Sequence, residues 1–327
     1  MEIRRVPVRH RVTVTAAVAF LLLFAAGEAA AQWVWTPQTG RFLNIDRMPR
    51  ETPELQVQYA RSLMLEGDLR KAYRETLKFD NFYGDTDWAD ENQFLRGEIR
   101  MRQGAYLSAA NEFQAVVSSY PDSDLFDDVI EKQYEIGDFY YDRGVARQEG
   151  RWRPFRNRPF KRAITVYTMV IDNQPFTDAA AEAQYKVGLC HFARDEYIEA
   201  AFEFRRVLED YATSPWVQDA SYKLSNTYVN SALPPQYDQT PSALAIAAIN
   251  DHTVRYPGDE RTAELTEWRE DMATRIATQR LESAQFYERR RQFEAARISY
   301  EAVAEQFPGT EAGNIASAWL QAYANGR

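Results

Sequence analysis

The sequence predicts an all-α fold, an α-solenoid of about six helix hairpins with a capping helix at its C-terminus. Three observations predict this fold: helical segments recur at a spacing near 37 residues, small residues lie at matched points of successive helices, and aromatic–proline pairs end the units. A single hairpin of this kind cannot bury its apolar face alone, so several hairpins must stack to form one continuous core.

The repeat length is visible in pairs of equivalent residues. Gly67 and Gly104 lie 37 positions apart, and so do Ala72 and Ala109. In units without an insertion, a small residue of the first helix precedes an alanine of the second helix by twelve positions, and a large residue follows that alanine by four. The three sets are Gly97, Ala109 and Phe113; Gly188, Ala200 and Phe204; and Ala284, Ala296 and Tyr300. Small residues let two helices approach closely, and the large residue one turn on fills the remaining space.

Helix ends agree with these units. The units are predicted to begin near Thr52, Trp88, Leu125, Asp178, Ser214 and Asp259. Prolines that follow Tyr120, Tyr256 and Phe307 end units, because proline cannot continue a helix. Hydroxyl–proline pairs predict N-caps at Thr52, Ser214 and Thr240. Together with a capping helix at 312–323, this is the pattern of tetratricopeptide repeats (TPRs), lengthened by a few residues.

The first 31 residues are predicted to be a secretory signal peptide. Four arginines precede an apolar run at 12–26, and Ala29-Ala30-Ala31 supplies a cleavage site. The alternative is an uncleaved membrane anchor, but the run is short for a helix of roughly 20 residues across a bilayer. The only cysteine is Cys190, so the cleavage point lacks the cysteine that a lipoprotein signal requires. We therefore expect no lipid there.

Three further segments follow the predicted leader. Residues 32–51 form a non-helical arm whose two tryptophans are expected to dock, either on the first repeat of this chain or on a partner. Residues 52–176 hold the N-terminal TPR units, with a basic insertion at 143–160. Residues 177–327 hold the C-terminal units, with a second insertion at 231–239, a long first helix from about Asp259 to Arg289, and the capping helix.

Composition argues against catalysis and against nucleic acid as a partner. The formal charge is −9, and removal of the leader, with four arginines and two glutamates, makes it −11. An acidic surface repels nucleic acid. Only His191 and His252 remain after cleavage, without further ligands at metal spacing, and no phosphate loop or nucleophile motif occurs. We expect no enzyme activity, catalytic residue, cofactor, metal or small-molecule substrate, and we interpret both histidines as ordinary helix residues and Cys190 as a buried thiol.

Two sets of residues are candidates for a peptide-binding groove on the first helices. Four aromatic residues lie three positions before the small residue: Phe94, Tyr134, Tyr185 and Tyr222. Three positions further back lie the acids Glu91, Glu131 and Glu182. The aromatics suit an extended peptide, or they pack between neighbouring helices. The acids favour basic or neutral ligands, or they only offset the positive ends of the helices.

The insertion in the third unit is the most basic part of the chain. It combines basic and aromatic residues, the main ones being Arg147, Arg151, Trp152, Arg153, Phe155, Arg156 and Arg158. This composition suits an anionic membrane surface or an acidic partner. The alternative is a solvated loop. Phe160, at the end of the insertion, is also interpreted as one of its aromatic residues.

The order of several C-terminal motifs resembles one family. These are Pro-Gln-Tyr-Asp-Gln-Thr (235–240), Arg-Tyr-Pro-Gly-Asp-Glu (255–260), Phe-Tyr-Glu-Arg-Arg-Arg-Gln-Phe-Glu-Ala-Ala (286–296) and Phe-Pro-Gly-Thr (307–310). With the repeats and the leader, the sequence over 50–325 resembles the BamD family, TPR subunits of the outer-membrane β-barrel assembly machinery, but without the lipid-bearing cysteine.

The resemblance implies a periplasmic protein beside the outer membrane. Its N-terminal repeats would bind unfolded outer-membrane proteins, its C-terminal repeats would bind the barrel-forming subunit, and the basic insertion would make a peripheral membrane contact in place of the lipid. The leading alternative is a periplasmic TPR adaptor of another envelope complex, of the Tol-Pal or pilus-assembly type. A third class, the scaffold domain of an enzyme, is disfavoured because the repeats fill the chain.

Overall fold

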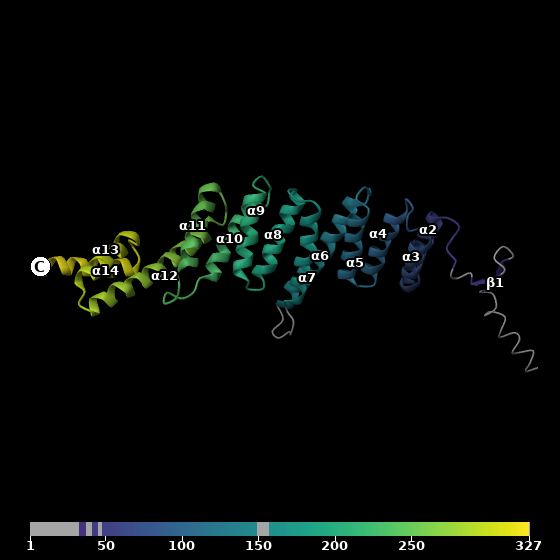
Figure 1. The fold of residues 1–327 in the computed structure, drawn as a ribbon. Coiled ribbons are helices and arrows are strands. Elements are labelled where there is room, and N and C mark those ends of the chain that lie inside the picture. The colour runs from purple at the N-terminus through teal and green to yellow at the C-terminus, as the bar shows by residue number, and fades with distance from the viewer. Residues whose placement is uncertain (1–32, 37–40, 45–47, 149–156, 327) are drawn as a thin grey trace, which may run out of the picture. The chain divides into compact units, whose positions relative to one another are not determined.

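The computed structural model describes residues 33–36, 41–44, 48–148 and 157–326. Within them it contains 13 α-helices, α2 to α14, and one two-stranded sheet (Figure 1). The helices pack as six consecutive pairs, and α14 packs on the last pair. The predicted six hairpins and capping helix are therefore confirmed. The chain forms two compact units, one up to Leu125 and one from Phe126 onwards.

The first unit contains two helix pairs and the strands that precede them. Its elements are β1 (Trp33–Thr36), β2 (Arg41–Asn44), α2 (Pro53–Leu65), α3 (Leu69–Tyr83), α4 (Ala89–Arg102) and α5 (Tyr106–Ser119). β1 and β2 pair antiparallel, with Trp33 opposite Asn44 and Trp35 opposite Phe42. The sequence predicted a non-helical arm here but not this pairing. Trp35 is about half exposed, and docking of the tryptophans stays a prediction.

The second unit contains four helix pairs and the capping helix. Its elements are α6 (Phe126–Gln148), α7 (Arg158–Asn173), α8 (Asp178–Phe192), α9 (Tyr197–Asp210), α10 (Val217–Ser231), α11 (Thr240–Arg255), α12 (Thr262–Arg289), α13 (Phe293–Gln306) and α14 (Glu311–Asn325). The long first helix of the last pair is α12, which begins three residues later than predicted. The division expected after residue 176 lies inside this unit, at the turn from α7 to α8.

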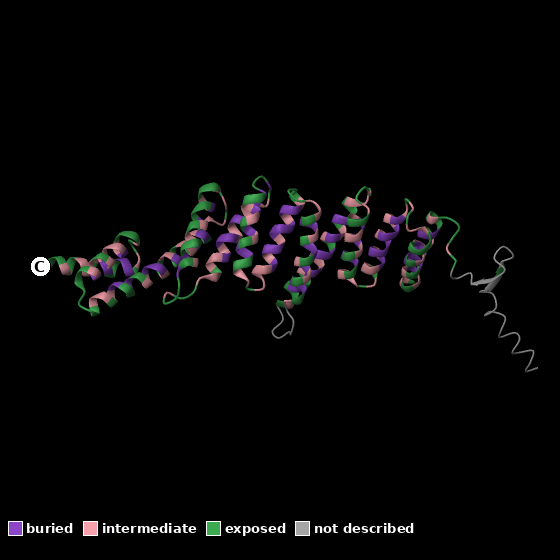
Figure 2. Cartoon of the chain, viewed as in Figure 1, coloured by how far each residue is buried: buried purple, intermediate pink, exposed green. Residues whose placement is uncertain are grey.

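A small residue meets a large ring inside the helix pairs, as the twelve-and-four spacing predicts. Most helices have one buried and one exposed side (Figure 2). A Cβ atom added at Gly97 would lie 2.4 Å from the ring of Phe113, and one added at Gly188 would lie 2.6 Å from the ring of Phe204. Both rings are fully buried. The glycines thus bring the two helices of a pair into van der Waals contact through a ring.

The third pair uses the same contact twice, which corrects the predicted insertion. Gly144 lies over the ring of Phe160, so that residues 143–148 continue α6, and α7 begins at Arg158. Phe160 is fully buried. It belongs to the core, not to a basic aromatic loop, because burying its ring against Gly144 extends the helix pair by a turn. Residues 149–156 of the predicted insertion lie outside the described residues.

One of the three predicted N-caps is correct. The hydroxyl of Thr52 accepts a hydrogen bond from the Leu55 amide, with Pro53 in the first helical turn. Ser214 instead accepts from the amide of Trp216 in the turn before α10, which begins two residues later than predicted. Thr240 is already the first residue of α11, and its hydroxyl donates to Asp238. Both hydroxyls therefore form hydrogen bonds within the preceding turn and do not cap the helix.

A polar contact between the two helices of a pair recurs beside the ring contact. The side-chain amide of Gln56 donates to the carboxylate of Glu75 at 2.9 Å, and Gln93 donates to Glu112 at 2.9 Å. Gln184 donates to Glu203 in the same way. Each glutamine is buried and lies four positions before the small residue. Because buried polar groups need partners, this contact also restrains the register of the two helices.

The ring contact can be tested by adding one methyl group. Gly188→Ala is expected to destabilise the chain, because the steric cost of about 1–3 kcal/mol in a packed core exceeds the gain of about 0.5–1 kcal/mol for alanine over glycine in a helix. Urea unfolding followed by circular dichroism measures the change. Gly258→Ala is the control, because nothing lies within 4 Å of the added Cβ there. A Gly188→Ala protein at least as stable as the wild type would contradict this account.

Candidate protein-binding surface

The four predicted groove aromatics occupy one equivalent position in four helix pairs. Phe94 lies in α4, Tyr134 in α6, Tyr185 in α8 and Tyr222 in α10. Three of them contact the large ring of their own second helix. Ring centroids are 5.0 Å apart for Phe94 and Phe113, 6.2 Å for Tyr134 and Tyr167, and 5.7 Å for Tyr185 and Phe204. The aromatic position therefore adds a second ring beside the ring that covers the glycine.

In the second unit the tyrosines also contact the following helix pair. The Tyr134 hydroxyl donates to the carbonyl oxygen of Ala179 in α8. Tyr185 stacks on Trp216 with centroids 5.3 Å apart, and Tyr222 stacks on Trp268 at 5.6 Å. These rings lie where successive pairs meet.

Exposure differs among the four aromatics. Tyr185 is buried, whereas Phe94, Tyr134 and Tyr222 are half-buried. Burial raises the pKa of Tyr134 and of Tyr185, and burial with a hydrogen bond to Glu264 raises the pKa of Tyr222 to about 12. All three phenols are protonated at neutral pH and can donate hydrogen bonds.

Two of the three predicted acids form ion pairs. Glu91 pairs with Arg61 at 2.7 Å, and Glu182 pairs with Lys186 at 2.9 Å. Glu131 is exposed. Lys186 also pairs with Asp138 at 2.7 Å and lies 5.3 Å from the ring centroid of Tyr134. This lysine was not among the predicted residues, although it ties α8 to the aromatic position of α6.

His252 is the centre of a buried polar cluster, which corrects its interpretation as an ordinary helix residue. Its ring nitrogens lie 3.0 Å from Asp259 and 3.1 Å from Ser221. Arg261 pairs with Asp259 at 2.7 Å and with Asp219 at 2.8 Å. The side chains of His252 and Asp259 are 0% and 1% exposed, so no substrate can reach them. The cluster joins α10, α11 and the start of α12.

The other histidine and the cysteine have local roles. Nδ1 of His191 lies 2.9 Å from a carboxylate oxygen of Glu196. Cys190 is buried in α8, and burial raises the pKa of its thiol. Among the described residues, no group of three or more histidine, cysteine or carboxylate side chains is arranged to hold a metal ion. In the same part of the chain no helix is long and apolar enough to cross a bilayer.

The predicted membrane or partner loop is only partly described. Arg147 is half-buried in the last turn of α6, and Arg158 is exposed at the start of α7. The remaining predicted residues, Arg151, Trp152, Arg153, Phe155 and Arg156, lie outside the described residues. The two described arginines flank that segment on both sides.

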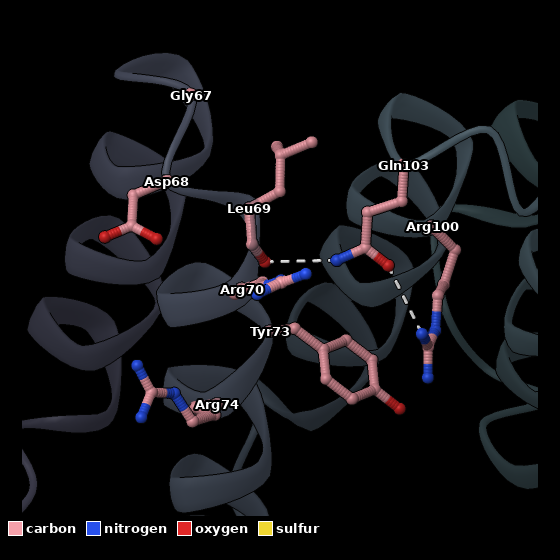
Figure 3. A pocket seen from close by; sticks show the side chains of 8 residues that line it. All are labelled: Gly67, Asp68, Leu69, Arg70, Tyr73, Arg74, Arg100 and Gln103. Atoms are coloured by element: carbon pink, nitrogen blue, oxygen red, sulfur yellow. Dashed lines mark hydrogen bonds between the residues drawn. The ribbon is translucent and has the colours of Figure 1, made fainter.

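A hollow lined by arginines was missed by the sequence analysis. It has a volume of about 980 Å³ and opens in the first unit beside the turn from α2 to α3 (Figure 3). Arg70, Tyr73 and Arg74 line it from α3, and Arg100 lines it from α4. The guanidinium carbon of Arg100 lies 3.8 Å from the ring centroid of Tyr73. No linear sequence motif predicts this site, because its residues come from two different helix pairs.

Comparison with protein families gives two matches. The model of the YfiO family, described as an outer membrane lipoprotein, matches residues 153–325, and a model of the tetratricopeptide repeat matches residues 91–123. The first match covers α7 to α14 completely, and the second covers most of α4 and all of α5. A search of curated proteins finds none that matches this chain.

Solved structures with a similar arrangement of helices include two bacterial TPR proteins. One from Parabacteroides merdae is 14% identical, with a TM-score of 0.33, over 82% of this chain and 97% of that one. The C-terminal part of a TPR repeat-containing protein from Cytophaga hutchinsonii is 16% identical, with a TM-score of 0.35, over 82% of this chain and 88% of that one. Similarities at this level carry no argument about function.

Acidification is expected to destabilise the second unit through His252. Burial lowers the pKa of His252 from the usual 6.5, against the opposing hydrogen bond to Asp259. As the pH falls, His252 of the unfolded chain therefore binds a proton at a higher pH than His252 of the folded chain does. The stability that neutral His252 contributes is therefore complete above about pH 6.5 and is lost as the pH falls below it, at no more than ~1.4 kcal/mol per pH unit.

Thermal unfolding at pH 7.5 and pH 5.5 tests this expectation. The drop in Tm between the two values should be smaller for His252→Gln than for the wild type. The neighbouring Asp259, whose pKa is held low chiefly by Arg261, changes its contribution only below about pH 4, outside this window. Equal drops in the two proteins would contradict the role given to His252.

Proposed function

Because the chain belongs to the YfiO family of outer membrane lipoproteins, we propose that it is a periplasmic scaffold of the machinery that assembles β-barrel proteins in the outer membrane. YfiO is the BamD family, so the predicted resemblance is confirmed. Members of this family are non-enzymatic assembly factors, and the chain is therefore not an enzyme. Its partners are proteins of the assembly machinery.

The observation that carries the proposal is the extent of the family match. Residues 153–325 comprise most of the second unit. The role in assembly that the family shares is therefore expected to lie in this unit. In the proposal, this unit binds the barrel-forming subunit. The first unit, which carries the TPR match at 91–123, receives unfolded outer-membrane proteins.

The aromatic position supports a peptide-binding role of both units. Phe94 in the first unit, and Tyr134 and Tyr222 in the second, each keep part of their ring accessible. Half-buried rings held by neighbouring helices lose little conformational entropy on binding, which makes them good contacts for an extended chain. Glu131 is the exposed acid beside this row, so neutral or basic segments are the expected ligands at this row.

Export and membrane contact are part of the same proposal. Residues 1–31 would be removed after Ala31, which places the mature chain in the periplasm. Cys190 is buried in α8 and is not a site for a lipid. The basic segment from Arg147 to Arg158 would provide the membrane contact, since basic residues beside anionic lipids contribute about 1 kcal/mol each.

Affinity purification with site-specific crosslinking tests the partner assignment. A photoreactive phenylalanine at Phe94 or at Tyr222, in the exported full-length chain, is expected to crosslink unfolded outer-membrane proteins in envelope extracts. The barrel-forming subunit is expected in the eluate of the uncrosslinked protein. The matched control carries the photoreactive residue at exposed Arg205 in α9. A peptidoglycan-associated or pilus protein in place of the barrel-forming subunit would favour the adaptor alternative.

Flotation with liposomes tests the membrane contact. The mature chain is expected to float with vesicles that contain anionic phosphatidylglycerol, and replacing Arg147, Arg151, Arg153, Arg156 and Arg158 with serine should reduce the floated fraction at least tenfold. Each lost arginine removes about 1 kcal/mol of attraction to an anionic surface. The control replaces five exposed arginines outside this segment. Equal flotation of the wild type and the segment variant would contradict a membrane contact through this segment.

A further inference from the structure

The arginine-lined hollow of the first unit has cations that the described structure leaves unpaired. Arg70 and Arg74 are exposed on α3, and within the described residues no carboxylate forms an ion pair with either of them. Arg100 donates to Gln103 at 3.2 Å, but its Nε is buried without a hydrogen-bond partner. The same Nε forms a long ion pair with Glu112, at 3.9 Å. Unpaired guanidinium groups are therefore available on the α3 side of the hollow, and Arg100 adds a partly paired one on the α4 side.

The fold itself does not require these cations. At the 37-residue spacing, Arg70 and Arg74 correspond to Leu107 and Asn111 of the second helix pair. That pair forms the same glutamine–glutamate contact as the first pair without a cation at either position. The two arginines are therefore not needed for the helix pair, and their guanidinium groups are free to bind an anionic group.

The cations are separated from the acids of the predicted groove. Glu91 lies in the first turn of α4 and Arg100 in its last turn, so that about 13 Å of helix lies between them at 1.5 Å per residue. Asp68 is the one carboxylate among the residues that line the hollow. It caps α3 by accepting from the Lys71 amide, and in Figure 3 its side chain points away from Gln103 and Arg100. The hollow therefore has a cationic character in an acidic protein.

The size of the hollow and the spacing of its arginines select the ligand. A volume of about 980 Å³ lies at the upper end of the range of ligand pockets and far exceeds one inorganic anion. Arg70 and Arg74 are one helical turn apart, with Cβ atoms about 5–6 Å from each other. Alternate residues of an extended chain point to the same side and lie about 6.6 Å apart. Two carboxylates at positions i and i+2 of a strand therefore have nearly the spacing of the two arginine Cβ atoms, whose long side chains can turn to reach them.

We propose that this hollow binds an extended acidic segment with carboxylates at alternate positions, the apolar residue between them lying against Tyr73. The inference rests on the proposed function, since strands destined for a membrane β-barrel alternate apolar and polar residues and so present acids at this spacing. Arginine forks bind carboxylates bidentately, which gives the contact its direction. A planar membrane surface would reach only the exposed arginines and not Arg100 inside the hollow.

Fluorescence anisotropy with the mature full-length chain tests the proposal. The probe is a labelled peptide Gly-Ser-Glu-Phe-Glu-Leu-Ser-Gly, compared with the same peptide carrying glutamine at both glutamate positions and with one carrying adjacent glutamates. Arg70→Gln/Arg74→Gln is expected to raise the Kd at least tenfold. The charge-matched control, Arg205→Gln/Arg289→Gln at exposed positions of α9 and α12, is expected to stay within twofold of the wild type.

A second variant keeps the test independent of folding and of bulk charge. Arg70→Lys/Arg74→Lys retains both charges but not the forks, and its Kd should lie between those of the wild type and the glutamine variant. Raising the salt from 50 to 300 mM should weaken binding of the glutamate probe. Equal affinity for the glutamine peptide, or equal loss in the control variant, would overturn the proposal. The proposal would also be overturned if the glutamate peptide did not bind while the chain floated with anionic vesicles in a way that required Arg70 and Arg74.

The same samples separate this inference from the proposed function. A wild-type chain that binds a urea-unfolded outer-membrane protein but not the alternating glutamate peptide would overturn only the acidic-segment site. A chain that binds the peptide through Arg70 and Arg74 but no unfolded outer-membrane protein would support the site and refute the proposed client.

Discussion

The structure depends on one contact, a large ring against a small residue between the two helices of a pair. Where the small residue is glycine, a Cβ atom would meet the ring of Phe113, Tyr167, Phe160 or Phe204 at 2.4–2.6 Å. The contact sets how closely the two helices approach in the pairs that contain it. It also explains why α6 and α7 extend beyond the ordinary repeat, since a second contact of this kind, between Gly144 and Phe160, prolongs them.

Contacts between successive hairpins use a different chemistry. Tyr185 and Trp216 stack, Tyr222 stacks on Trp268, and Lys186 binds Asp138 across α8 and α6. Aromatic rings with polar ends suit such positions, because the ring is packed while its hydroxyl finds a partner. The same rings are the candidate contacts for a bound peptide. A substitution there changes stability and binding together, so crosslinking at these positions is more informative than truncation to alanine.

Charge at the two ends of α4 follows the helix direction. Asp90 and Glu91 lie in the first turn, where the helix end is positive, and Arg100 and Arg102 lie in the last turn, where the end is negative. This arrangement stabilises the helix and at the same time separates an acidic edge from a cationic one. The arginines of α3 extend the cationic edge beyond what the helix needs. An acidic protein thus retains a surface that suits carboxylates.

The sequence alone determined the fold class, the six hairpins, the capping helix and the family. These follow from contacts that are local along the chain, since helix periodicity and a fixed interval of twelve and four residues bring Gly188, Ala200 and Phe204 together in any hairpin of this length. The aromatic position was also located by this interval. Which of its rings stay accessible was not, because Tyr185 is covered by Trp216 from the next hairpin, 31 residues further on.

Only the tertiary structure decided the remaining features. The burial of His252 beside Asp259 and Ser221, the ion pair of Asp219 with Arg261, and the arginine-lined hollow each combine residues from different helices or hairpins. Their side-chain types are ordinary for a helix surface, so the pattern gives no sign of them. Whether such a side chain is buried, and which side chain it pairs with, depends on how one hairpin packs against the next. The core position of Phe160 was missed for the same reason, since Phe160 resembles a loop aromatic until Gly144 of the partner helix is found against its ring.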